Sequence, residues 1–574
     1  MENVFNGSDL NQKTIFDHPS GLFVLFFTEM WERFSYYGMR AILVLFLTAS
    51  LLDEGWGWER KDAMILYGWY TMLVYFTPLI GGILADKLLG YRNAVVIGAF
   101  LMALGHASLA LESMEQGFFY LGLILLIAGN GLFKPNISSI VGQLYKPDDS
   151  RIDGAYTIFY MGINAGAFLG ILLCGYLGEK VGWHYGFGLA GIFMFFGMLQ
   201  FFFAQNIFGS IGTKPKVQKK SFIEINIFSA MSVVWQYIVY GFENAGRLAY
   251  LNIGIISCLV ALVFGIFLGP FAFVLLTLLW YFILVFAKNL TAIEIDRIIV
   301  ILIFSASTVF FWWAFEQAGG SMTIFAKDYT NRELSGNSAD IFNTINTIIT
   351  LVPMIIVTYV LFKLFQNTFK KYFISNIFLG LSFVIIWCIV YYMLNAEIGQ
   401  ETSEIPASWF SVLNSLFIIL LAPVFSKIWA SKYNPSGPKK FGIGLILLGV
   451  GYLFVAYGSM GIPAGAQTAS VSIMWLVYAY LFHTLGELCL SPVGLSYVSK
   501  LAPVRLIGIM FGFWLLSSAV ANGFAGWTGS YINDISSAIG LNGFFGIFAL
   551  VPIGAGLIMF LLNSFIKRKM HGIK

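Results

Sequence analysis

Charged residues are scarce in this chain. Asp, Glu, Lys and Arg make up 11% of its 574 residues and hydrophobic residues 58%, whereas a soluble domain has about 25% charged residues. A protein core could not bury this much apolar surface, so we expect the chain to lie in a lipid bilayer. The apolar runs are long and lack the ~10-residue alternation of a transmembrane β-barrel, which predicts an all-α polytopic membrane protein.

Cysteine is rare as well, and familiar catalytic motifs are missing. The four cysteines, Cys174, Cys258, Cys388 and Cys489, fall inside predicted spans, which is typical of small buried apolar residues rather than of disulfides or metal ligands. No HExxH, GxSxG or paired-aspartate protease motif occurs. These absences predict no enzyme, no metal and no cofactor, and they disfavour an intramembrane enzyme or lipid-handling protein.

The N-terminus also lacks the features of a signal peptide. Residues 1–19 are polar, with no apolar core and no small-residue cleavage site, so we expect them to be retained. The basic residues behind the net charge of +4 lie in loops between apolar runs, and no nucleic-acid partner is predicted.

Apolar windows of about twenty residues predict the membrane spans. Before residue 210 they lie at 20–50, 63–86, 93–113, 118–141, 154–178 and 186–206. After residue 293 they lie at 295–325, 340–366, 374–397, 406–429, 441–459, 471–499, 505–532 and 544–565. Runs 252–268 and 271–288 predict a further helical pair, and 222–241 is expected to lie along the membrane interface. The total is about 14–16 spans.

Loop charges predict the orientation. The loops that carry several Lys or Arg residues alternate with loops that carry none, such as 112–117 and 397–405. By the positive-inside rule the basic loops are cytoplasmic, as are both termini, which predicts a multi-pass protein of the cell inner membrane. The basic residues are Lys87, Arg92, Lys146, Arg151, Lys214, Lys216, Lys219, Lys220, Lys370, Lys371, Lys432, Lys439, Lys440, Lys500, Arg505, Lys567, Arg568 and Lys569.

The span order suggests the repeated halves of secondary transporters. We predict two six-helix bundles plus additional helix pairs, and function as a monomer. The expected regions are a cytoplasmic segment 1–19, an N-terminal six-helix bundle 20–210, a cytoplasmic linker 211–292 with the inserted pair, a C-terminal bundle 293–566 that includes an extra pair at about 340–397, and a cytoplasmic tail 567–574.

Four charges stand inside the first span. Glu29, Glu32 and Arg33 are spaced i, i+3 and i+4, which places them on one helical face, and Arg40 continues the stripe. Glu29 lies roughly 13 Å into the span at 1.5 Å per residue. Intramembrane charges usually face a bundle interior or a watery cavity. A buried ion-pair cluster that only fixes helix packing is the alternative.

Three further charges are intramembrane: Lys134, Glu316 and Glu487. With the first span they give four acids and three bases, so one acid lacks a base, as a proton-driven transporter needs. The bases all lie in the first half, whereas Glu316 and Glu487 lie in the second. A cavity between such halves suits a small zwitterion, with its carboxylate toward Arg33 and Lys134 and its ammonium toward Glu487.

Several motifs resemble the proton-dependent oligopeptide transporter (POT/PTR) family of the major facilitator superfamily. EMWERFSYYG (29–38) matches the family's ExxERFxYYG signature at every fixed position. GNGLFKPNISSIVG (129–142), FYMGINAG (159–166) and GELCLSPVGLS (486–496) look like its other diagnostic stretches. GGILADKLLGYR (81–92) resembles the superfamily's gating loop, here with Asp86 and Arg92.

The resemblance implies a role for each matching residue. Arg33 and Lys134 would receive the peptide carboxylate, and Glu487, helped by Ser491, would hold the amino terminus. Glu29, Glu32 and Glu316 would couple transport to protons. The residues expected to contact the peptide backbone are Asn164 and Asn414, and those expected to line side-chain pockets are Tyr36, Tyr37, Tyr75, Trp312 and Trp514; plain core packing is the alternative for each aromatic.

Some features depart from the family pattern. The stretch around Asn414 reads FSVLNS where the family usually has FQSxNP, and the similar FNTINT makes Asn346 a rival. The second span holds no histidine, so the carboxylates must carry the proton. His483, one turn before Glu487, could modulate that acid, although a hydrogen-bonded structural histidine is the favoured interpretation.

The function expected from these features is proton-coupled symport of di- and tripeptides by alternating access. The alternative on the same fold is a transporter of another small zwitterion or anion, such as an amino acid or nitrate. No cofactor other than the coupling proton is expected.

Overall fold

The computed structural model describes residues 13–146, 149–214, 291–397, 400–503 and 507–573, which are nearly all helical. Twelve helical stretches of these residues are long and apolar enough to cross a membrane. The prediction of a polytopic helical protein is confirmed, whereas the pair at 252–288 and the interface run at 222–241 lie outside the described residues. The first six long helices are α1 (Ser20–Thr48), α2 (Arg60–Leu84), α3 (Tyr91–Leu109), α4 (Gln116–Gln143), α5 (Ile152–Lys180) and α6 (Trp183–Ala204).

The second half of the chain contributes the other long helices. They are α8 (Ala292–Phe315), α10 (Asn337–Thr368), α11 (Phe373–Glu397), α12 (Val412–Trp429), α13 (Gly437–Gly458), α14 (Met474–Leu501), α15 (Ile507–Gly529) and α16 (Ile532–Leu561). A short helix, α17 (Asn563–Lys569), follows them. α16 starts before residue 544, where the span was predicted to begin, because its first part is polar and hydropathy windows do not detect it. The helix is kinked at Gly540, where φ is 78°.

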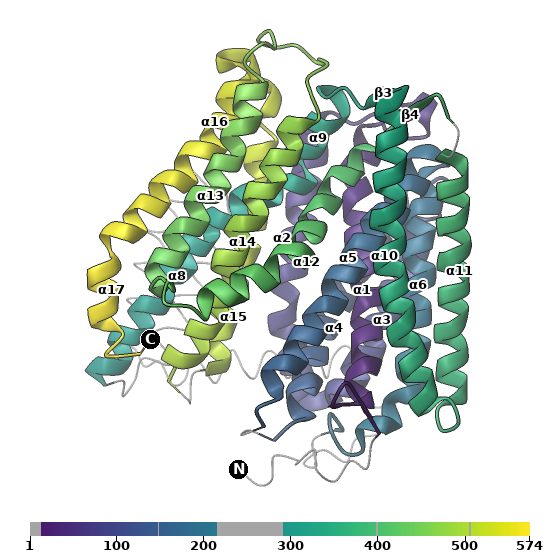
Figure 1. The fold of residues 1–574 in the computed structure, drawn as a ribbon, viewed down its shortest axis with the longest axis vertical. Coiled ribbons are helices and arrows are strands. Elements are labelled where there is room, and N and C mark those ends of the chain that lie inside the picture. The colour runs from purple at the N-terminus through teal and green to yellow at the C-terminus, as the bar shows by residue number, and fades with distance from the viewer. Residues whose placement is uncertain (1–12, 147–148, 215–290, 398–399, 504–506, 574) are drawn as a thin grey trace.

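The helices form two bundles that stand side by side (Figure 1). α1 packs on α5 and α6, and α3 on α4, while α13 packs on α14 and α16. The bundles meet where α2 contacts α15 and where α5 contacts α12. At the first contact the backbones touch, because a Cβ built on Gly68 would lie 2.7 Å from Cα of Gly526.

The span predicted at 295–325 is interrupted. α8 ends at Phe315, a 3₁₀ turn covers Glu316–Gly319 and a short helix, α9, covers Ser321–Asp328. The prediction of a span here is confirmed, and the 3₁₀ turn within it was not predicted. The turn fits closely against α2, since a Cβ on Gly319 would overlap the Tyr67 hydroxyl.

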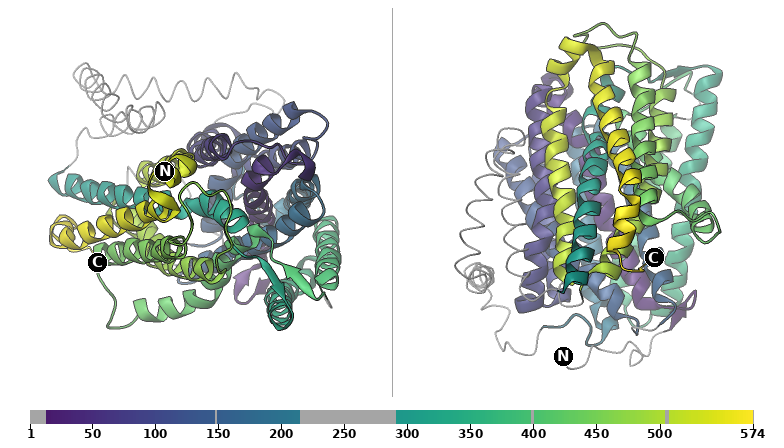
Figure 2. Two further views of the ribbon diagram at one scale, coloured as in Figure 1. Left: turned by 90° about the horizontal axis from the view of Figure 1, so that it is seen from above. Right: turned by 90° about the vertical axis from the view of Figure 1, so that its left-hand side faces the viewer.

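α10 and α11 follow α9 in the chain but pack against the other bundle. α11 contacts α6, and Phe383 of α11 lies edge-on to Phe27 and Trp31 of α1, with ring centroids 5.7 and 5.6 Å apart. Ser375 Oγ donates to the carbonyl of Gln200 at 2.7 Å. Both helices therefore stand at the edge of the first bundle (Figures 1 and 2), so their assignment to the C-terminal bundle describes chain order only.

The two ends of the molecule differ. We call one of them the basic end. It carries α17, the 369–372 turn and the small ribbon of β1 (Thr14–Ile15) and β2 (His18–Pro19). The opposite end carries α9 and the antiparallel pair β3 (Glu333–Ser335) and β4 (Thr402–Glu404), in which Leu334 faces Ser403. β3 and β4 are the connections of the α10–α11 pair to the rest of the chain.

Candidate functional site

The charges of α1 form the predicted cluster. Arg33 Nε lies 2.7 Å from Glu29 Oε1 and 3.0 Å from Glu32 Oε2, and all three side chains are buried. Asn130 of α4 donates to Glu32 Oε1 at 3.0 Å. The expectation that these residues share one helical face is confirmed. One guanidinium is shared by two carboxylates, so loss of either negative charge would change how strongly Arg33 is held.

Small residues on α5 bring this cluster to the bundle interior. A Cβ on Gly166 would lie 2.9 Å from Cβ of Arg33, and one on Gly170 would overlap the carbonyl of Phe34. α1 and α5 are therefore in near-backbone contact along the charged stripe. Asn164 lies two residues before Gly166 and is buried, with its amide donating to the carbonyl of Tyr160 at 3.0 Å.

Lys134 of α4 faces an aromatic ring. Its Nζ lies 3.8 Å from the ring centroid of Tyr75 on α2, which is a favourable cation–π distance. Among the described residues it makes no ion pair, although Arg33 and Glu32 lie within electrostatic range. Gly131 makes this approach of α4 to α2 possible, because a Cβ there would lie 2.7 Å from Cβ of Thr77.

An ion pair joins the two halves near the helix break. Arg40 of α1 pairs with Glu316 of the 3₁₀ turn, and Arg40 Nε donates to the Tyr67 hydroxyl at 2.9 Å. The Tyr67 hydroxyl in turn donates to the carbonyl of Glu316 at 3.3 Å. All three side chains are buried, so the break in the seventh span brings an acid of the second half onto a base of the first.

Glu487 of α14 has only neutral partners among the described residues. Asn414 Nδ2 of α12 donates to Glu487 Oε2 at 3.1 Å, and Thr484 Oγ1 donates to Asn414 Oδ1 at 2.6 Å. Sequence reasoning missed Thr484, although its position three residues before Glu487 on the same helix was a usable signal. Ser491 lies one turn further along α14 and is partly buried.

The rival asparagine and the nearby histidine lie in different settings. Asn346 belongs to α10, is buried, and its amide nitrogen has no hydrogen-bond partner among the described residues. The geometry favours Asn414, which alone of the two contacts Glu487. The His483 ring packs against the Tyr452 ring at a tilt, with ring centroids 4.5 Å apart, and neither ring nitrogen has a partner in the described part of the chain. The expectation of a hydrogen-bonded histidine was wrong.

The predicted aromatic residues are packed among other rings. Tyr36 and Tyr37 are edge-on at 5.1 Å, and the Arg40 guanidinium lies 5.8 Å from the Tyr37 ring. Trp312 lies 5.1 Å from Phe315. Trp514 is buried and fits against Gly494, whose Cβ would overlap its ring. These contacts are equally those of a packed core, so pocket roles for the rings stay predictions.

The predicted gating loop forms a compact turn. Asp86 lies in a π-helical turn, Ala85–Leu89, that follows α2. The side chain of Arg92 donates to the carbonyl of Gly209, and its backbone nitrogen donates to the carbonyl of Gly212 at 3.0 Å. This turn is thereby tied to the segment that follows α6.

Two sets of hydrogen bonds, called clamps here, join the halves at the end opposite the basic end. Sequence reasoning missed both. Arg60 at the start of α2 donates to Asp328 Oδ2 at 2.8 Å and to Asn533 Oδ1 at 3.1 Å. Glu179 of α5 accepts hydrogen bonds from the backbone nitrogens of Ala407 and Ser408 at 2.8 and 2.9 Å.

Two ion pairs of Glu404 lie beside the second clamp. Glu404 of β4 binds Lys180 at 2.6 Å and Arg332 at 2.9 Å. Burial alone would raise the pKa of Glu404, but the hydrogen bond from Lys180 and the charge of Arg332 bring it below its ordinary value. These contacts come from loops and helix ends that are far apart in the sequence, so no local pattern signals them.

The fold and the site together define a class. Two membrane-spanning helical bundles with buried acids and bases where they meet are the architecture of a secondary transporter of the major facilitator type. In the described residues no group of three His, Cys, Asp or Glu side chains is placed to hold a metal ion. A sequence model of the POT family matches residues 92–401 and 385–545. The chain belongs to the POT family and is a membrane transporter rather than an enzyme.

Individual relatives extend over nearly the whole chain. The peptide transporter YePEPT of Yersinia enterocolitica is 34% identical over 535 residues, 91% of this chain and 89% of that protein. A di-/tripeptide transporter of Lactococcus lactis is 30% identical over 98% of this chain and 99% of its own length. A crystal structure of peptide transporter POT in complex with sulfate superimposes with a TM-score of 0.70 and 30% identity over 99% of both chains.

Proposed function

We propose that this protein is a proton-coupled symporter that imports di- and tripeptides by alternating access. The observation that carries the proposal is the opposed charge across the site. Arg33 and Lys134 lie in the first bundle, while Glu487 in the second has only the neutral Asn414 as its partner among the described residues. A zwitterionic peptide would complement both walls. The names of the two relatives, which are peptide transporters, support the substrate class.

Each end of the peptide then has a binding partner. The carboxylate binds Arg33 and Lys134, and the ammonium binds Glu487, next to Ser491. Asn164 and Asn414 hydrogen-bond the peptide backbone. The side-chain pockets are lined by aromatic residues, namely Tyr36, Tyr37, Tyr75, Trp312 and Trp514.

Proton coupling follows from competition for Arg33. The guanidinium is occupied by Glu29 and Glu32, so a substrate carboxylate binds more readily once one acid is protonated. Glu316 has the second role, because its protonation would break the pair with Arg40 that joins the halves. Each proton that moves down the membrane potential supplies about 2.3 kcal/mol per 100 mV.

The direction of transport follows from the two ends. We assign the basic end to the cytoplasm, with both termini there and the protein in the cell inner membrane as a monomer. The clamps at Arg60 and Glu179 join the halves at the opposite end and would have to open to admit substrate from outside. Asp86 and Arg92 would act in the closure of the cytoplasmic side.

Uptake of labelled dialanine into proteoliposomes tests the proposal. With an inward proton gradient we expect accumulation that an uncoupler abolishes and that unlabelled dipeptides, but not nitrate or single amino acids, compete away. Competition by nitrate or amino acids in place of dipeptides would establish the alternative substrate class. Accumulation that persists with the uncoupler would refute proton coupling.

A further inference from the structure

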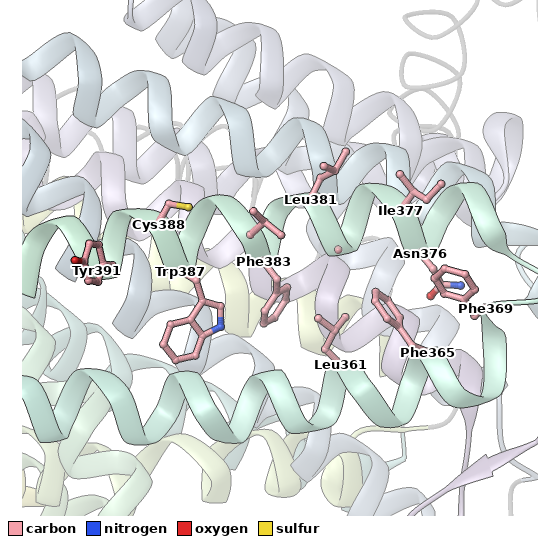
Figure 3. Close-up of a pocket in the computed structure, with 12 residues that line it drawn as sticks. Leu361, Phe365, Phe369, Asn376, Ile377, Leu381, Phe383, Trp387, Cys388 and Tyr391 are labelled. Atoms are coloured by element: carbon pink, nitrogen blue, oxygen red, sulfur yellow. The ribbon is translucent and has the colours of Figure 1, made fainter.

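α10 and α11 enclose an apolar groove that the transport mechanism does not use. The groove has a volume of about 780 Å³ and is lined on the α10 side by Leu361, Phe365 and Phe369. From α11 come Phe383 and Trp387, which point toward α10, with further residues along the helix (Figure 3). The lining contains no charged side chain; its full α11 set is Asn376, Ile377, Gly380, Leu381, Phe383, Val384, Trp387, Cys388 and Tyr391.

The groove opens away from the protein. Val384 and Tyr391 on its wall are 60% and 72% exposed, although they belong to a helix long and apolar enough to cross a membrane. Within a bilayer this exposed surface faces acyl chains. Asn376 to Tyr391 spans about 22 Å at 1.5 Å per residue, which exceeds the ~15 Å half-thickness of a hydrocarbon core. The groove is therefore long enough for an acyl chain of one leaflet.

A patch of positive charge lies at one end of the groove. Lys370 and Lys371 are exposed in the turn directly after the lining residue Phe369, and Lys363 lies on α10 nearby. No acidic residue occurs between Ile341 and Ala396. This end is the basic end of the molecule, where the turn meets the headgroup region. Clusters of lysine at this depth attract anionic lipid headgroups.

We propose that the α10–α11 groove is a binding site for an anionic phospholipid. Its acyl chain lies along Phe365, Phe383 and Trp387, and its phosphate lies against Lys370 and Lys371. The proposal does not depend on the transported substrate, because the pair stands outside the bundle interface and contributes none of the site residues. Charge complementarity at one end and an apolar groove along the span select the same ligand.

Native mass spectrometry of the purified full chain tests this site. The protein is titrated with phosphatidylglycerol or with phosphatidylcholine that carries the same acyl chains. For the unmodified chain we expect one tightly retained phosphatidylglycerol, at concentrations about 10-fold lower than for phosphatidylcholine. Lys370→Gln with Lys371→Gln should abolish that preference. The matched control, Lys432→Gln with Lys439→Gln, removes two exposed lysines from the α12–α13 region and should preserve it.

Two variants test the apolar part of the site. Val384→Phe fills the groove from an exposed wall position, and Gly380→Leu fills it from a position whose Cβ would lie 3.5 Å from the Phe365 ring. Both should weaken retention of both lipids, and Val384→Phe answers the question even if Gly380→Leu fails to fold.

Three results would overturn the proposal. The first is an equal phosphatidylglycerol preference in the two lysine double variants, and the second is unchanged retention in Val384→Phe. The third is competition by glycerol phosphate, which has no acyl chain and would reduce the site to a phosphate-binding surface.

Discussion

The two halves of this transporter hold their buried acids differently. In the first half, Glu29 and Glu32 share Arg33 on the same helix, a pairing that their local spacing makes possible. In the second half, Glu487 has an amide partner and no cation among the described residues. A buried charge without a counter-charge is costly, so a ligand ammonium would relieve that cost at Glu487. The first half is thus suited to exchange a proton, and the second to hold a substrate group.

The largest expected effect comes from removing one of the two acids that share Arg33 in the first half. Glu32→Gln keeps the shape of the side chain and the contact with Asn130 but leaves Arg33 with one carboxylate, a state that protonation would otherwise produce. Driven uptake of dialanine should fall to the level seen with an uncoupler, while exchange of internal for external peptide continues. Radiolabel uptake and counterflow in the same proteoliposomes measure the two activities.

The control for this variant is Glu333→Gln, the same change at an exposed position of β3, which should leave both activities unchanged. If Glu32→Gln still accumulates peptide against a gradient, the coupling role moves to Glu29 or Glu316.

The second prediction concerns Glu487, the acid that has no cationic partner among the described residues. Glu487→Gln should weaken binding of free-amino dipeptides by about 2–3 kcal/mol, roughly 30- to 150-fold, because a hydrogen-bonded ion pair with the ammonium is lost. N-acetylated dipeptides lack that charge and should bind the variant as they bind the original protein. Isothermal titration with the two ligand series measures the difference. Equal losses in both series would remove Glu487 from ammonium binding.

The cluster on α1 could be predicted from sequence because it is local. Spacing of three and four residues places Glu29, Glu32 and Arg33 together on any helix, and apolar windows place the spans. The partner of Arg40 could not be derived in this way. Glu316 lies 276 residues away, and it reaches Arg40 through a break in an apolar stretch that hydropathy reads as continuous.

Contacts between the halves were missed for the same reason. Arg60 and Glu179 find their partners 268 and 228 residues away, at helix ends whose own sequences carry no sign of a partner. The position of α10 and α11 is a further case. Their hydropathy marks two spans, but contacts between distant residues, such as that of Phe383 with Trp31, place them on the first bundle.

A smaller effect distinguishes the two asparagines. Asn414→Ala removes the amide that contacts Glu487 and should weaken peptide binding about 10-fold, in keeping with the 1.5–3 kcal/mol scale of hydrogen bonds to charged groups. Asn346→Ala removes a buried amide whose nitrogen has no partner in the described residues, so binding should stay within about 2-fold. Dipeptide titration of both variants checks this. The reverse order would make Asn346 the substrate-binding residue.

The smallest effect concerns an ion pair outside the membrane, where pH should matter least. Because Lys180 and Arg332 bring the pKa of Glu404 below its ordinary value of 4.5, the pair contributes fully above pH 4.5 and is lost only as the pH falls through that lower pKa. Between pH 5 and 8 its contribution is constant. It is partly exposed, so it is worth no more than about 1 kcal/mol, and Glu404→Gln should change the uptake rate by less than about 5-fold. The shape of the pH–uptake profile should match the original protein, whereas Glu32→Gln should flatten it. A profile that shifts in Glu404→Gln would mean that the clamp at the opposite end, and not only the α1 cluster, responds to protons.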